Sequence, residues 1–183
     1  MSTPLTSNAF AQKYKQAAIE ASAGTKIFAA TILAAAGLES GNGGSYLASK
    51  YNNFFGIKAD SSWTGKKIIL PTKEQDKTGK VFTVNAPFRW YDSPTDSFRN
   101  YVHFISGTRY VKAGVLAAST PQEQFSALHK AGYATDISYV EKLTAKLASF
   151  GSDISDLIKR IPPAAAGGGF VTSIAIFFLQ LFF

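Results

Sequence analysis

Apolar side chains recur at helical spacing through most of the first 150 residues, and a single block of different pattern interrupts them. In that block, two runs rich in Ile, Val, Phe and Thr, residues 66–74 and 81–91, flank a polar turn and predict a β-hairpin. Helices are expected at residues 7–22 and 25–40 before it, and near 94–105, 110–118, 121–131 and 138–150 after it. This pattern predicts an α+β fold that is mostly α, with one small hairpin lobe.

The end of the chain has a different composition. Two prolines, Pro162 and Pro163, end the preceding short helix and three glycines follow, so residues 161–169 are expected to link a domain of residues 1–160 to a tail of residues 170–183. Counting from residue 164 gives 20 uncharged residues, about the length that a bilayer-spanning helix needs. We expect a hydrophobic tail helix that begins near residue 164 and anchors the chain to a membrane. A buried interface helix and a shifted reading frame are the alternatives.

The charge of the chain restricts its partners and its chemistry. Nineteen Lys and Arg residues against twelve Asp and Glu give a net charge of +7, all before residue 161, which favours an anionic partner. A nucleic acid, an acidic lipid surface and a bacterial wall polymer are the classes considered. With no cysteine and two histidines, a thiol nucleophile and a Cys2His2 zinc finger are excluded. The first eight residues lack both a basic stretch and an apolar run, so we expect no cleavable signal peptide.

Elimination among the twelve carboxylates leaves two candidates for acid and base catalysis. The other ten are expected at helix starts, on polar helix faces or in turns, where a negative charge has an ordinary structural role. Glu39 ends the second predicted helix on its apolar stripe, so desolvation should raise its pKa and suit it as a general acid for a glycosidic leaving group. The alternative for Glu39 is a hydrogen bond into the glycine-rich loop that follows. Glu74 ends a predicted strand and, judged alone, is an ordinary surface residue.

Several separated motifs stand in a fixed order along the chain. They are Leu38-Glu39-Ser40-Gly41, the run Tyr51-Asn52-Asn53-Phe54-Phe55-Gly56-Ile57-Lys58-Ala59, Trp63 with Gly65, Thr72-Lys73-Glu74, Phe88-Arg89-Trp90-Tyr91-Asp92-Ser93, Arg109-Tyr110, and Ala131-Gly132-Tyr133-Ala134-Thr135-Asp136 followed by Tyr139 and Leu143. In this order they resemble the glucosaminidases of glycoside hydrolase family 73, over about residues 10–148. The resemblance implies a lysozyme-like helical domain with a small β-hairpin lobe that cleaves the glycan strand of peptidoglycan.

The resemblance also implies roles for individual residues. The catalytic glutamate of the family falls on Glu39 as proton donor, its second carboxylate on Glu74, and the tyrosine of its Gly-Tyr-Ala-Thr motif, close to the acid, on Tyr133. Where the family often has an aromatic residue after Ser-Gly, this chain has Asn42, so one sugar-stacking contact is unsupported. The family acts as an endo-enzyme on the β-1,4 bond between N-acetylglucosamine and N-acetylmuramic acid, through a buried acid and without metal or cofactor. Inversion, retention and assistance by the substrate N-acetyl group stay open.

Asparagine and aromatic side chains of these motifs are candidates for contact with the sugars: Asn53, Phe55, Trp63 and Tyr91. Asn53 has the alternative of only shaping its loop. For Phe55, as for Phe54 and Trp90, packing in the core is the stronger interpretation.

Peptidoglycan is the expected partner. No nucleic acid is expected, because the net charge alone favours one and no recognition motif is present. A catalytic domain with a hydrophobic tail indicates a phage-type lytic enzyme, in a virion-associated membrane or at the host cell envelope. The alternative is a non-catalytic wall-binding or virion structural protein that retains the fold.

Overall fold

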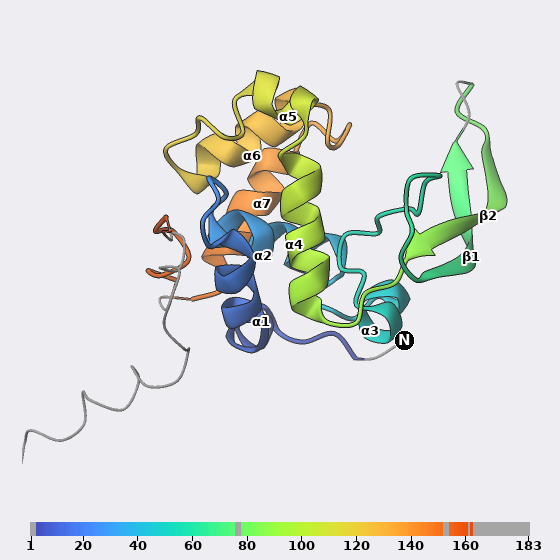
Figure 1. Ribbon diagram of the computed structural model, residues 1–183, viewed down its shortest axis with the longest axis horizontal. Helices are drawn as coiled ribbons and strands as arrows, with labels where there is room; N and C mark the ends of the chain where they lie inside the picture. Colours follow the sequence, from blue (N-terminus) through green and yellow to red (C-terminus); the bar gives the residue numbers. More distant parts are fainter. Residues whose placement is uncertain (1–2, 76–77, 152–153, 161, 163–183) are drawn as a thin grey trace, which may run out of the picture.

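The computed structural model describes residues 3–75, 78–151, 154–160 and 162. Its elements, in chain order, are α1 (Ser7–Ser22), α2 (Ala29–Glu39), α3 (Tyr46–Tyr51), β1 (Lys67–Gln75), β2 (Val81–Arg89), α4 (Pro94–Ile105), α5 (Thr108–Ala113), α6 (Pro121–Lys130) and α7 (Tyr139–Ala148). The helices form one body, and the two strands form a hairpin to one side of it (Figure 1), so the predicted α+β fold is confirmed. The expected linker and tail helix lie outside the described residues. No described helix is long and apolar enough to cross a membrane.

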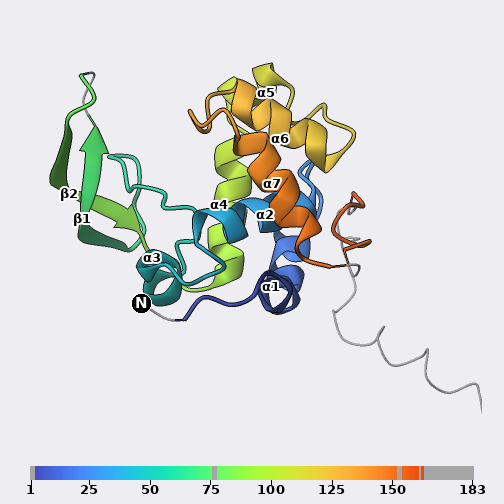
Figure 2. The same ribbon diagram turned by 180° about the vertical axis from the view of Figure 1, so that it is seen from behind.

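Helix α2 is the centre of the helical body. Its residues from Ala29 to Gly37 are all buried, and more than half of them are alanines, whose small side chains let neighbouring helices approach closely. Helices α1, α4, α6 and α7 contact it, and Figure 2 shows α7 running across it. Helix α2 runs through the core and ends at Glu39, so it places the Glu39 carboxylate at the surface of the helical body.

Helix α2 begins later than the sequence predicted, at Ala29 and not near Thr25. The Thr25 hydroxyl is engaged in the preceding turn. The start of α2 is capped from another helix, because Gln124 of α6 accepts hydrogen bonds from the Phe28 N–H at 3.1 Å and the Thr31 hydroxyl at 2.8 Å. A contact between residues 96 positions apart therefore sets the start of this helix.

The helix starts predicted from Ser-Pro and Thr-Pro pairs are confirmed. Ser93 caps α4 and Thr120 caps α6, each by accepting a hydrogen bond from a backbone N–H three residues along the chain. Two other helices differ from the prediction, and the short helix expected before Pro162 is a series of turns over residues 154–158. Helix α5 ends at Ala113, because Gly114 has a left-handed backbone with φ of 99°, and the short α3 lies in a segment expected to be a loop.

The predicted hairpin is confirmed. Strands β1 and β2 pair antiparallel over their full lengths, with Lys67 opposite Arg89 at the base and Glu74 opposite Phe82 near the turn. Side chains alternate between the two faces. In β1 the face that carries Glu74 is half-buried, whereas the opposite face is open to solvent, with Ile69 64% exposed.

Candidate active site

Glu39 holds its carboxylate at the surface of the helical body. The residue is exposed, whereas the family resemblance implied a buried acid, because α2 ends where the core ends. The hydroxyl of Tyr139, the first residue of α7, donates a hydrogen bond to Glu39 Oε1 at 3.1 Å. Protein atoms around the inner side of the carboxyl raise the pKa of Glu39 by desolvation, and the hydrogen bond from Tyr139 opposes this rise. The raised pKa agrees with the expectation from the sequence.

Four tyrosine rings form a cluster beside Glu39. The ring centroid of Tyr133, from the loop between α6 and α7, lies 5.7 Å from that of Tyr139, 5.8 Å from that of Tyr101 and 6.3 Å from that of Tyr110. Burial is the main cause that raises the pKa of Tyr101, Tyr133 and Tyr139. The charges of neighbouring phenols and of the Glu39 carboxyl raise it further. These phenols therefore stay protonated well above neutral pH and remain hydrogen-bond donors.

Among these four residues, Tyr133 is the one for which the sequence predicted a role. Tyr139, which makes the hydrogen bond to Glu39, had no assigned role. The available signal was the position of Tyr139 at the start of a predicted helix, directly after the motif that contains Tyr133, and the presence of Tyr110 in another motif.

Glu74 lies on the other lobe. Its carboxylate forms an ion pair with Lys58, whose backbone bridges to Phe88 of β2. Among the described residues, no hydrogen bond or ion pair joins Glu74 to Glu39, so the structure does not bring the two predicted catalytic carboxylates into contact. Within the described ranges, no group of three His, Asp or Glu side chains is placed to hold a metal ion.

Asn42 supports the loop that follows Glu39. Its φ of 53° is left-handed, a conformation that asparagine adopts more readily than most residues. Its side-chain amide donates to the Leu5 carbonyl at 3.0 Å and accepts from Lys146 Nζ at 3.0 Å. An aromatic side chain at this position would lose both bonds, so the departure from the family pattern has a structural reason here.

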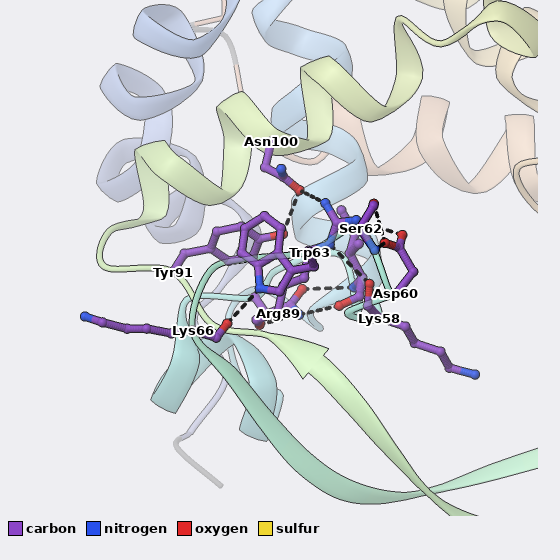
Figure 3. A network of polar contacts seen from close by, with 10 residues as sticks. Lys58, Asp60, Ser62, Trp63, Lys66, Arg89, Tyr91 and Asn100 are labelled. Atoms are coloured by element: carbon purple, nitrogen blue, oxygen red, sulfur yellow. Dashed lines mark hydrogen bonds and ion pairs between the residues drawn. The ribbon is translucent and has the colours of Figure 1, made fainter.

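The four sugar-binding candidates fall into two groups. Asn53, Phe55 and Tyr91 are buried: Asn53 donates to two backbone carbonyls, Phe55 stacks on an α4 ring at 3.9 Å, and the Tyr91 hydroxyl donates into a polar network. Trp63 is half-buried, with the Arg89 guanidinium 4.5 Å from its ring centroid (Figure 3). As placed, the first three hold the fold together, and Trp63 is the one of the four with surface open to a ligand.

Two neighbouring aromatic residues were also expected in the core. Phe54 is 1% exposed, as expected. Trp90 is 39% exposed, so core packing was wrong for it. Trp90 directly follows β2, where the Tyr51 ring lies at a centroid distance of 5.2 Å and Lys66 Nζ lies 5.9 Å from the indole ring centroid, and much of the indole stays uncovered.

Comparisons relate the chain to glycan-cleaving enzymes. Residues 15–151 match the glucosaminidase family model, described as mannosyl-glycoprotein endo-beta-N-acetylglucosaminidase. The chain is similar to exo-glucosaminidase LytG of Bacillus subtilis, with 37% identity over 128 residues, 68% of this chain and 44% of LytG. It is also similar to peptidoglycan hydrolase FlgJ of Salmonella typhimurium, with 38% identity over 121 residues, 63% of this chain and 37% of FlgJ. The chain thus spans less than half the length of these two relatives.

Solved structures of related domains have the same fold. A C-terminally truncated glycoside hydrolase domain of Salmonella typhimurium FlgJ superposes with a TM-score of 0.64 and 35% identity, over 78% of this chain and 95% of that one. The catalytic domain of the autolysin Auto from Listeria monocytogenes superposes with a TM-score of 0.69 and 26% identity, over 82% of this chain and 87% of that one. With a family match over most of its length, an acid-bearing helix and a hairpin lobe, the chain belongs to the glucosaminidases of glycoside hydrolase family 73.

Proposed function

We propose that the chain is a peptidoglycan hydrolase that cuts the β-1,4 bond between N-acetylglucosamine and N-acetylmuramic acid within the glycan strand. The observation that carries the proposal is the state of Glu39: an exposed carboxyl with a raised pKa, held by one hydrogen bond at the end of a buried helix. A general acid needs a carboxyl that keeps its proton at working pH and is open to the substrate. Glu39 is open to solvent, and its pKa is shifted upward, in the direction that a general acid requires.

The hydrogen bond from Tyr139 divides the Glu39 carboxyl into two different oxygens. Oε1 accepts from the Tyr139 hydroxyl, whereas Oε2 has no partner among the described residues. The proton is therefore carried on Oε2 and passes to the bridging glycosidic oxygen as the bond from that oxygen to the anomeric carbon breaks. Water then adds to the anomeric carbon, and the released proton restores the acid.

Glu74 is the proposed second carboxylate, and Tyr133 a neighbour that shapes the acid's surroundings. A second carboxylate can assist attack at the anomeric carbon, and Glu74 is held on the hairpin by its ion pair with Lys58. Assistance by the N-acetyl group of the substrate is the competing route. Whether Glu74 is needed for turnover separates these two routes.

The test of Glu39 is the Glu39→Gln variant, which keeps the shape of the side chain and removes its transferable proton. We expect the rate of new reducing ends from purified peptidoglycan to fall by about 10²-fold to 10⁴-fold. Glu141→Gln is the matched control, because Glu141 is an exposed glutamate on α7 without a catalytic role. Near wild-type hydrolysis by the Glu39→Gln protein would refute the assignment.

The reaction products show which glycosidic bond is cleaved and whether cleavage is endo or exo. Borohydride reduction of the digest followed by acid hydrolysis should yield glucosaminitol, because N-acetylglucosamine is the expected new reducing end. Recovery of muramicitol would show cleavage of the other bond. Since LytG is named an exo-glucosaminidase and the family description is endo, product length is measured too: an endo-enzyme releases fragments of mixed length from the start of digestion.

We also propose that the enzyme is of phage type and acts from a membrane, in a virion or at the host cell envelope. Two sequence features support this setting: the uncharged residues 164–183 and the net charge of +7, which suits an anionic wall. The tail deletion described in the Discussion tests the membrane part of this proposal.

A further inference from the structure

A pocket of about 390 Å³ opens between the base of the hairpin and α4. Its walls combine aromatic and polar side chains from both lobes: Ser62, Trp63, Arg89, Asn100, His103 and Phe104, with Gly107. The volume falls in the range of small-molecule sites, which are apolar cavities with a few placed polar groups. The size and the lining therefore suit one ligand unit such as a sugar ring.

Asn100 supplies a hydrogen-bond donor with a fixed direction. Its Oδ1 accepts two hydrogen bonds, from Arg89 Nη1 at 3.0 Å and from the Tyr91 hydroxyl at 2.8 Å (Figure 3). Both partners are donors, so they determine which end of the amide is the oxygen. Asn100 Nδ2 must then point the other way, and it has no partner among the described residues. Asn100, a residue of the pocket wall, thus carries an N–H group whose orientation is fixed by Arg89 and Tyr91.

The aromatic walls of the pocket are held in place as well. The Trp63 indole N–H donates to the Lys66 carbonyl at 3.0 Å, and the Arg89 guanidinium lies 4.5 Å from the ring centroid. A Cβ atom at Gly65 would lie 2.5 Å from the Trp63 ring, so glycine there makes room for the indole. Phe104 is 38% exposed, and its ring centroid lies 6.4 Å from that of Tyr133. Phe104 therefore connects the wall of the pocket to the tyrosine cluster beside the acid.

We propose that this pocket is a subsite for an N-acetylated hexose and that Asn100 Nδ2 donates a hydrogen bond to its acetamido carbonyl, a proposal that rests on the function proposed above. Trp63 and Phe104 supply apolar faces for the C–H groups of the sugar ring. A sugar hydroxyl both donates and accepts, but an amide carbonyl only accepts. Both groups can accept from a fixed N–H donor, and the donor favours the acetamido group because an amide carbonyl is a stronger acceptor than a hydroxyl. Asn100 is then a residue that selects N-acetylated sugars.

The test measures binding and not turnover, on the full chain with Glu39→Gln to stop hydrolysis. Chitotetraose and cellotetraose have the same glycan linkage and differ in the acetamido groups. In an NMR titration, chitotetraose should shift the Asn100 side-chain amide and the Trp63 indole N–H signals, whereas cellotetraose should bind more weakly. Asn100→Asp keeps the acceptor for Arg89 and Tyr91 and removes the donor. We expect it to weaken chitotetraose binding about tenfold and to leave cellotetraose binding unchanged.

Asn85→Asp is the matched control, because it makes the same charge change at an exposed position of β2. Equal affinities of the wild-type pocket for the two sugars would overturn the proposal. An equal loss for both sugars in Asn100→Asp would also overturn it, because charge or shape would then explain the loss. If the Asn100→Asp protein does not fold, the proposal is tested on the Glu39→Gln chain alone. An Asn100 side-chain amide signal that chitotetraose does not shift would then overturn the proposal. Wall hydrolysis that survives Glu39→Gln would refute the proposed function alone, since sugar binding is read separately.

Discussion

The Tyr139→Phe variant tests how the structure controls the catalytic acid. It removes the hydroxyl that donates to Glu39 Oε1 at 3.1 Å and keeps the ring whose centroid lies 5.7 Å from that of Tyr133. The hydrogen bond favours the charged carboxylate and so lowers the pKa of Glu39 against the desolvation that raises it. Without the hydroxyl, the pKa of Glu39 should rise further. Because the acid works in its protonated form, the alkaline limb of the pH–rate profile should move to higher pH.

The size of the effect on rate follows from the exposure of the site. A hydrogen bond to a charged group contributes about 1.5–3 kcal/mol, and we expect the lower end because water reaches Glu39 and replaces the lost donor. The phenol also fixes which oxygen faces the substrate. Losing about 1.5 kcal/mol of this orientation should lower kcat at the pH optimum by about tenfold. That is less than the loss expected for Glu39→Gln, because the transferable proton remains.

The assay is the rate of reducing-end release from purified peptidoglycan, measured from acidic to alkaline pH. Tyr14→Phe is the matched control, because it removes a phenol hydroxyl from α1, outside the tyrosine cluster. A thermal melt of each variant separates loss of fold from loss of rate. An alkaline limb that stays in place or moves to lower pH would refute the reasoning, because the Tyr139 hydroxyl would then not stabilise the Glu39 carboxylate.

Four other changes test the lobes and the tail. Gln124→Met should lower the free energy of unfolding by about 3 kcal/mol, since it leaves three buried groups, the Phe28 N–H, the Thr31 hydroxyl and the Val115 carbonyl, without this partner; an unchanged urea midpoint would contradict this. Glu74→Gln should lower wall hydrolysis about 100-fold, and Lys58→Met less than tenfold, because an exposed ion pair contributes under about 1 kcal/mol. If Glu74→Gln keeps more than about a tenth of the rate, assistance by the substrate N-acetyl group is favoured. Deleting residues 164–183 should leave a folded, active enzyme, whereas the full chain should partition into detergent; an unfolded deletion protein would place the tail in the core.

Sequence patterns predicted the helix boundaries that are set by residues close by in the sequence. The caps at Ser93 and Thr120 lie next to the helices that they begin, so they can be found in the sequence. The start of α2 could not be found this way, because Gln124 supplies its cap from another helix. The short α3 was missed because its six residues lie in a stretch rich in glycine and asparagine, which favours a loop prediction.

The sequence predicted the acid of the candidate site, but not the residues that surround the acid. Glu39 could be selected because a carboxylate at the end of an apolar stripe is unusual. Its partner Tyr139 is 100 residues away, and no pattern of spacing relates the two. The sugar-binding candidates show the other limit, because composition does not separate a buried Tyr91 from the half-buried Trp63 or the exposed Trp90.

The two proposed catalytic carboxylates are held in different ways. This difference indicates which contacts determine the distance between them. Glu39 ends a helix that four other helices surround, so the core fixes its position. Glu74 lies near the turn of a two-stranded hairpin, and such a hairpin has little stability of its own. What holds the hairpin is its base, where Arg89 donates to the Lys58 carbonyl, to Asn100 of α4 and to Asp60 (Figure 3). The position of Glu74 relative to Glu39 therefore depends on Arg89, far along the hairpin from Glu74, because its bond to Asn100 joins the base of the hairpin to α4 of the helical body.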